Sequence, residues 1–130
     1  MGYYRVTGGG TIGGEYTVRG SKNAVLPILA ASILAGDEVV LENVPHITDV
    51  FVSLEILEEL GCKTKLEGRT LTIDSRNIEK TEISEEMVGK MRSSILYLGA
   101  LLGRMKKASL GHPGGCMILS RVYKNGDLLA

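Results

Sequence analysis

The stretch Ser21-Lys-Asn-Ala-Val-Leu-Pro-Ile-Leu-Ala-Ala-Ser-Ile-Leu-Ala-Gly36 decides how this chain of 130 residues folds. Its apolar run, residues 24–35, is interrupted only by Pro27 and Ser32 and is too short to cross a bilayer. Ser21 belongs to the residue types favoured at helix N-caps, and Gly36 to those favoured just beyond the last turn. We therefore predict a helix between them, buried on most faces because it is apolar nearly all round.

The sequence on either side of this helix predicts a mixed α+β fold. Upstream, residues 3–7 and 15–19 are β-rich runs separated by glycines, which indicates two strands of a hairpin. Downstream we expect, in order, a strand over 38–44, a helix capped by Thr48 or Asp49 and ending at Gly61, a hairpin of 62–66 with 70–73, a helix from Ser84 to about Arg104, and a strand over 107–110.

A shift of 68 residues aligns 29–35 with 97–103 without a gap. In the same register Pro45 falls on Pro113, and Lys22 and Ala24 fall on Lys90 and Arg92, which would place basic side chains at the start of both helices. Helix starts with free N–H groups favour anions. We interpret the pattern as one complete β/α unit and the beginning of a second, with chance similarity as the alternative.

Composition favours one modest soluble domain, with 44% hydrophobic residues and 17 glycines. The first residues lack the pattern of a signal peptide, so we expect a cytoplasmic protein with no membrane partner. Two cysteines, Cys62 and Cys116, are expected to be free thiols, and Cys62 is interpreted as a small buried hydrophobic residue. With two histidines and no His/Cys cluster, neither a metal site nor a cofactor is expected.

The net charge of zero conceals an uneven distribution. Residues 87–126 contain seven basic residues and no acidic residue. This predicts that the second half of the chain faces an anion. For Lys106, Lys107 and Lys124 the alternative is ordinary solvated surface.

The glycine motifs of nucleotide-binding proteins give no support for a nucleotide site. Gly8-x-Gly10-x-x-Gly13 matches the dinucleotide fingerprint in form, but a predicted strand follows it where that fold needs a helix. A P-loop is absent, and no nucleic-acid partner is expected.

Cys116 is the candidate reactive residue, because it follows two glycines in a predicted loop with His112 and Arg121 close in sequence. Positive surroundings lower the pKa of a thiol and favour the thiolate. An incidental loop cysteine is the alternative. Arg92, within a mostly apolar stretch, either extends to solvent or points at an anion. Asn23 has an alternative reading as ordinary polarity at a helix start.

An ordered set of short blocks resembles the UDP-N-acetylglucosamine enolpyruvyl transferases, which begin peptidoglycan synthesis in bacteria. The resemblance covers residues 1 to about 121. The blocks are Gly20-Ser21-Lys22-Asn23-Ala24 with Leu26-Pro27, then Asn43-Val44-Pro45, Asp49-Val50, Leu60-Gly61, Met91-Arg92-Ser93-Ser94 and Pro113-Gly114-Gly115-Cys116.

The resemblance implies a fold of repeated β-α-β-α-β-β units, the inside-out barrel of the enolpyruvate transferases, incomplete in this chain. Residues 1–21 would be hairpin strands of a second domain that is missing here. Residues 22–121 would form a partial first domain of about one and a half units, followed by a divergent tail, 122–130. The chain departs from the family pattern at Leu119 and Val122, where the family has glycine and proline.

The resemblance also implies an activity, the transfer of the enolpyruvyl group from phosphoenolpyruvate to the 3′-hydroxyl of UDP-N-acetylglucosamine, without a cofactor. Lys22 would bind phosphoenolpyruvate, Asn23 would contact the UDP-sugar and Arg92 would line the substrate cleft. Arg121 would bridge both substrates. Cys116 would donate a proton to the phosphoenolpyruvate methylene carbon, and it is the position that fosfomycin alkylates in this family.

Two alternatives to an active transferase remain open at this point. In one, the chain is a truncated piece of the transferase and is inactive by itself, with open strand edges that favour self-association. The other is a stand-alone, non-catalytic domain that binds anionic ligands or a partner. The sister family, the 3-phosphoshikimate enolpyruvyl transferases, shares the fold but lacks the Pro-Gly-Gly-Cys loop.

Overall fold

A computed structural model describes residues 2–110 of the chain, and these residues form the mixed α/β fold that the sequence predicts. The elements follow one another as α1 (Lys22–Ala35), β1 (Glu38–Leu41), α2 (Thr48–Leu60), β2 (Lys63–Glu67), β3 (Thr70–Asp74), β4 (Glu82–Ile83), α3 (Glu85–Lys90), the 3₁₀ helix η1 (Arg92–Ile95), α4 (Leu96–Met105) and β5 (Ser109–Leu110).

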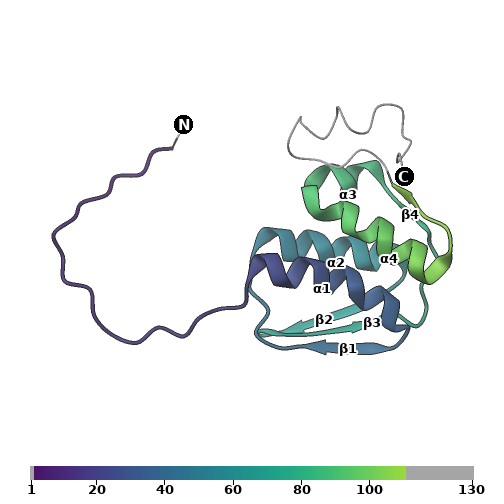
Figure 1. Cartoon of the computed structure of the whole chain (residues 1–130), viewed down its shortest axis with the longest axis horizontal. Helices are drawn as coiled ribbons and strands as arrows, with labels where there is room; N and C mark the ends of the chain where they lie inside the picture. Colours follow the sequence, from purple (N-terminus) through teal and green to yellow (C-terminus); the bar gives the residue numbers. More distant parts are fainter. Residues whose placement is uncertain (1, 111–130) are drawn as a thin grey trace.

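Three strands form an antiparallel sheet in the order β1-β3-β2. Thr72 in the central strand pairs with Val40 on one side and Lys65 on the other, so β1 and β2 run in the same direction. Leu71 and Ile73 of β3 are fully buried. Figure 1 shows α1 and α2 covering one face of this sheet, while the other face is open to solvent. The strand predicted over 38–44 is confirmed over Glu38–Leu41 only, and the predicted hairpin is confirmed.

Helix α1 lies at the centre of the described fold. It packs against α2, α4 and β1, and its Leu29 and Ile33 have no exposed surface. The approach of α4 is close, because a Cβ atom on Gly103 would lie 2.8 Å from Leu34 Cδ2. The predicted limits of this helix are confirmed, with Gly36 in the left-handed conformation at its end. Ser21 occupies the N-cap position, but its side chain makes no capping hydrogen bond.

Short strands β4 and β5 pair in parallel, with Ile83 opposite Leu110. The chain between them contains α3, η1 and α4, so these elements form a β-α-β crossover. Helix α4 contains the segment 97–103 that the sequence repeat aligned with α1, and the two helices pack against each other. The strand predicted over 107–110 is confirmed only over its second half, Ser109–Leu110.

The predicted N-terminal hairpin is wrong for the described chain. Residues 2–20 contain no strand, and Figure 1 shows this segment leading away from the packed elements. Tyr4 and Ile12 are almost wholly exposed, at 98% and 99%. The β-favouring residues are present, but β propensity depends on packing and on pairing with a neighbouring strand, and no strand within residues 2–110 pairs with this segment.

The single helix predicted from Ser84 to Arg104 is interrupted. Met91 is extended, with φ −151° and ψ 143°, and separates α3 from η1 and α4. The Met91 side chain is buried with its sulfur atom 3.7 Å from Ser53 Oγ, a tertiary contact that would be lost if residue 91 continued the helix. As a result Lys90 ends α3, contrary to the prediction from the repeat, whereas Arg92 begins a new helical segment.

The second helix begins close to the predicted position, but Ile47 rather than Thr48 or Asp49 occupies its N-cap. Gly61 ends this helix in the left-handed conformation, as predicted.

Gly20 fixes where α1 begins. A Cβ atom at this position would lie 2.2 Å from the carbonyl oxygen of Asn43 and 3.1 Å from Pro45 Cδ. The residue that precedes the N-cap of α1 is thus in direct contact with the segment that precedes α2. Only a residue without a side chain permits this approach.

We predict that Gly20→Ala displaces the starts of α1 and α2 from each other and destabilises the fold by about 1–3 kcal/mol, because backbone atoms must move to relieve the overlap. Urea unfolding followed by circular dichroism measures the loss. Gly8→Ala is the matched control, since a Cβ atom there meets nothing within 4 Å. Equal stability of the two variants would contradict the prediction.

Candidate functional site

The first turns of α1 and α2 lie side by side, joined by an ion pair. Lys22 Nζ is 2.5 Å from Asp49 Oδ2, and the two side chains are 58% and 27% exposed. Asp49 stands in the first turn of α2, where a negative charge is stabilised by the helix dipole. The contact follows from the close approach of Gly20 to Asn43, which brings the segments that precede α1 and α2 together.

The start of α1 is open to a ligand. The first turn carries no acidic residue and no side-chain cap. The N–H groups of Ala24 and Val25 bond to the Ser21 carbonyl, whereas nothing within residues 2–110 bonds the N–H groups of Lys22 and Asn23. Such unpaired N–H groups with a lysine beside them favour an anion.

Arg92 begins η1 near the same end of α2. Its neighbour Met91 contacts Ser53, which lies one turn after Asp49 and donates a hydrogen bond to the Asp49 carbonyl at 2.8 Å. The Arg92 side chain is exposed, and no carboxylate in the described part of the chain lies within 4 Å of it. Its guanidinium group is therefore available to solvent or to a ligand.

Other basic residues of the acid-free segment have structural roles. Lys90 Nζ lies 2.9 Å from Glu55 Oε2 and ties α3 to α2, and this hydrogen bond raises the pKa of Lys90. Arg104 lies over Gly36 at the end of α1 and donates to the Ser75 carbonyl at 3.5 Å. A cation there also suits the negative end of the α1 dipole. The prediction that this segment faces an anion thus rests mainly on Arg92 among the described residues.

Three of the residues predicted for the site lie in the described part of the chain. Lys22 and Asn23 share the exposed start of α1, and Arg92 begins the helical segment beside α2. Cys116 and Arg121 lie outside the described residues. The sequence predicts Asp49 as a helix cap and as part of a family block but does not predict its pairing with Lys22. The available signal is an acidic residue and a lysine, each in the first turn of a predicted helix.

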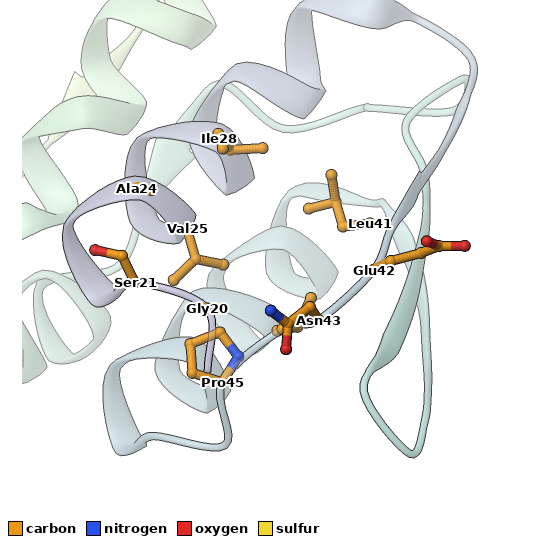
Figure 2. A pocket seen from close by; sticks show the side chains of 10 residues that line it. Gly20, Ser21, Ala24, Val25, Ile28, Leu41, Glu42, Asn43 and Pro45 are labelled. Atoms are coloured by element: carbon orange, nitrogen blue, oxygen red, sulfur yellow. The ribbon is translucent and has the colours of Figure 1, made fainter. Parts of the chain in front are cut away.

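A shallow pocket lies beside the start of α1. Figure 2 shows Val25 and Ile28 of α1 facing Leu41 at the end of β1, whereas the carboxylate of Glu42, the next residue, points away from the helix. The lining is mainly apolar, and its charged side chain is acidic. This composition does not suit an anionic ligand, although the pocket borders the start of α1 through Gly20 and Ser21.

Buried Cys62 is not a candidate nucleophile. Burial, with Asp74 nearby as a smaller cause, raises its pKa to about 11. Burial also raises the pKa of Tyr97. The interpretation of Cys62 as a small buried residue is confirmed.

Residues 2–110 offer neither a metal-binding cluster nor a membrane-spanning helix. There is no group of three or more His, Cys, Asp or Glu side chains that could hold a metal ion. No helix in this part of the chain is long and apolar enough to span a membrane.

We predict that Cys62 in a Cys116→Ser chain reacts with a disulfide reagent at pH 8 at least about a hundredfold more slowly than an unfolded thiol, because the raised pKa reduces the thiolate fraction by that factor. Absorbance of the released chromophore measures the rate. Addition of urea should restore full reaction of one thiol. Rapid reaction in the native chain would contradict the burial of Cys62.

Comparison with known proteins gives a consistent result. The family model for EPSP synthase (3-phosphoshikimate 1-carboxyvinyltransferase) matches residues 6–122. The chain is 45% identical over 118 residues to UDP-N-acetylglucosamine 1-carboxyvinyltransferase 2 of Caldanaerobacter subterraneus subsp. tengcongensis. It is 46% identical over 118 residues to UDP-N-acetylglucosamine 1-carboxyvinyltransferase of Borreliella burgdorferi.

Each of these alignments covers 91% of this chain but 28% of the relative, so the chain spans little more than a quarter of their length. Among solved structures, the enolpyruvyl transferase NikO from Streptomyces tendae is similar, with a TM-score of 0.62 and 30% identity. The match covers 66% of this chain and 20% of that protein.

Proposed function

Because this chain belongs to the EPSP synthase family of enolpyruvyl transferases, we propose that it is part of an enzyme that transfers the enolpyruvyl group from phosphoenolpyruvate to the 3′-hydroxyl of UDP-N-acetylglucosamine. The names of the relatives at 45% and 46% identity support this acceptor over 3-phosphoshikimate. The reaction would serve peptidoglycan synthesis in the cytoplasm and, through the cell wall, cell shape and division.

The observation that carries the proposal is the exposed, uncapped start of α1 with Lys22 beside it. Lys22 would bind phosphoenolpyruvate and Asn23 the UDP-sugar, while Arg92 would line the cleft. Both substrates are anions, and cations must hold the phosphate as it departs.

Two further residues complete the proposal outside the described part of the chain. Cys116 would protonate the methylene carbon and would be the position alkylated by fosfomycin. Arg121 would contact both substrates. Addition to an enol ether needs an acid at this carbon, which is the role assigned to the thiol.

The 130-residue chain by itself is proposed to bind substrate without turning it over. Lys22 is more than half exposed, so the site is open to water, which weakens every electrostatic interaction on which the transfer depends. Residues 22–121 would correspond to part of the first domain, residues 1–21 to a segment that forms strands only against a second domain, and residues 122–130 to a tail.

The second candidate function is a non-catalytic domain that binds anions or associates with a partner, and exposed apolar side chains favour it. Four large ones on the helices are 43–52% exposed: Ile28, Leu34, Phe51 and Leu102. Apolar patches of this kind are typical of protein interfaces.

We predict that phosphoenolpyruvate shifts backbone amide signals at the starts of α1 and η1 in ¹H–¹⁵N spectra, and that Lys22→Ala weakens this binding about tenfold, as expected for loss of a charge-assisted hydrogen bond. Lys65→Ala is the matched control, since Lys65 is exposed on the far face of β2 and pairs with Glu67. UDP-N-acetylglucosamine should shift signals near Asn23, and 3-phosphoshikimate should not.

Phosphate release from the chain with both substrates should equal that of a Cys116→Ser variant. Release above this control would show that the chain is active alone. A response to 3-phosphoshikimate and not to the UDP-sugar would contradict the proposed acceptor.

We also predict self-association, with an average mass in light scattering that rises with protein concentration. Leu102→Glu should lower it, because a charge on exposed α4 surface opposes apolar contact. Thr70→Glu, on the solvent-facing side of β3, should have no effect. A single monomeric species at every concentration would argue against this surface as an interface.

A further inference from the structure

We propose that Asp49 is a positioning residue for Lys22, which holds the lysine ammonium group at the start of α1 in the orientation that receives the anionic end of phosphoenolpyruvate. The proposal rests on the proposed function and adds a residue to it. It starts from the ion pair that joins the first turns of α1 and α2.

The two partners differ in how firmly they are held. The Asp49 side chain is 27% exposed, whereas the Lys22 side chain is 58% exposed. Ser53 Oγ donates to the Asp49 carbonyl at 2.8 Å within α2, and the neighbouring Val50 is fully buried in the core. The short aspartate is therefore the fixed point, and the long lysine side chain takes its orientation from it.

The ammonium group retains capacity for a ligand. Lysine has three N–H donors, and a single carboxylate oxygen at 2.5 Å occupies one of them. No other partner of this ammonium group is present within residues 2–110, and the backbone N–H groups of Lys22 and Asn23 are unbonded there as well. A ligand that binds here meets a lysine whose rotamers are already restricted, which lowers the entropic cost of binding.

The negative charge of Asp49 repels an anionic ligand, but the location of this carboxylate weakens the repulsion. It stands in the first turn of α2, where the positive end of the helix dipole offsets its charge. Within residues 2–110 the other ion pairs do not join two helix starts. Lys65–Glu67 lies along one strand and Lys90–Glu55 joins the end of α3 to the middle of α2.

The test compares Asp49→Ala, Asp49→Asn and the control Glu67→Ala in the full chain. The first readout is the side-chain ¹H–¹⁵N signal of the Lys22 ammonium group, with Lys90 as an internal reference. Asp49→Ala should abolish or broaden the Lys22 signal. Asp49→Asn should weaken it less, because an amide oxygen still accepts a hydrogen bond. Glu67→Ala should leave it unchanged.

The second readout is the dissociation constant for phosphoenolpyruvate, measured below the unfolding midpoint of every variant. Asp49→Ala should raise it about fivefold, which corresponds to immobilising one long side chain on binding. The dissociation constant of Asp49→Asn should lie between those of Asp49→Ala and of the unsubstituted chain. If the substitutions instead caused a general loss of structure, the free energy of unfolding would fall and the dissociation constants would not follow this order.

Tighter binding in both Asp49 variants would overturn the proposal and identify Asp49 as an anion that competes with the ligand. An unchanged Lys22 signal in Asp49→Ala would also overturn it. If the unsubstituted chain binds no phosphoenolpyruvate, the proposed function fails for this chain, and the Lys22 signal alone then decides whether Asp49 orients the lysine.

Discussion

The burial of α1 is the constraint on which the rest of the structure depends. A helix that is apolar nearly all round gains stability only when several elements cover it, and here the sheet, α2 and α4 each cover a part. The sheet lies on one side, while Gly103 lets α4 approach closely on another. Ile28 and Leu34 remain half exposed, so the covering of this helix is incomplete within residues 2–110.

The same helix determines where charge is available. Its start is pinned by the contact of Gly20 with the chain before α2, which places Lys22 beside Asp49. Its end is covered by Arg104. Basic residues that look alike in the sequence therefore separate into two groups. Lys90 and Arg104 hold elements together, whereas Lys22 and Arg92 present exposed cationic groups at helix starts.

Much of the fold follows from local patterns in the sequence. The limits of α1, the β2–β3 hairpin and the burial of Cys62 were all predictable, because periodicity, turn glycines and apolar character act over a few residues. The N-terminal hairpin was not, since strands need a partner that the pattern does not supply. The break at Met91 depends on Ser53, 38 positions earlier, and the pairing of Lys22 with Asp49 spans 27 positions. Contacts of this kind leave no local pattern.

The break at Met91 also bears on how such a chain can vary. In a continuous helix, one inserted residue would rotate every later side chain by about 100° and turn Arg92 away from its place. Because Met91 is extended and anchored by its buried side chain, Arg92 is the first residue of its own segment, and its direction does not depend on the phase of α3. A sequence change that alters the helical phase of α3 therefore leaves the direction of Arg92 set by the anchor at Met91, provided that Val88 stays buried and Lys90 stays paired with Glu55.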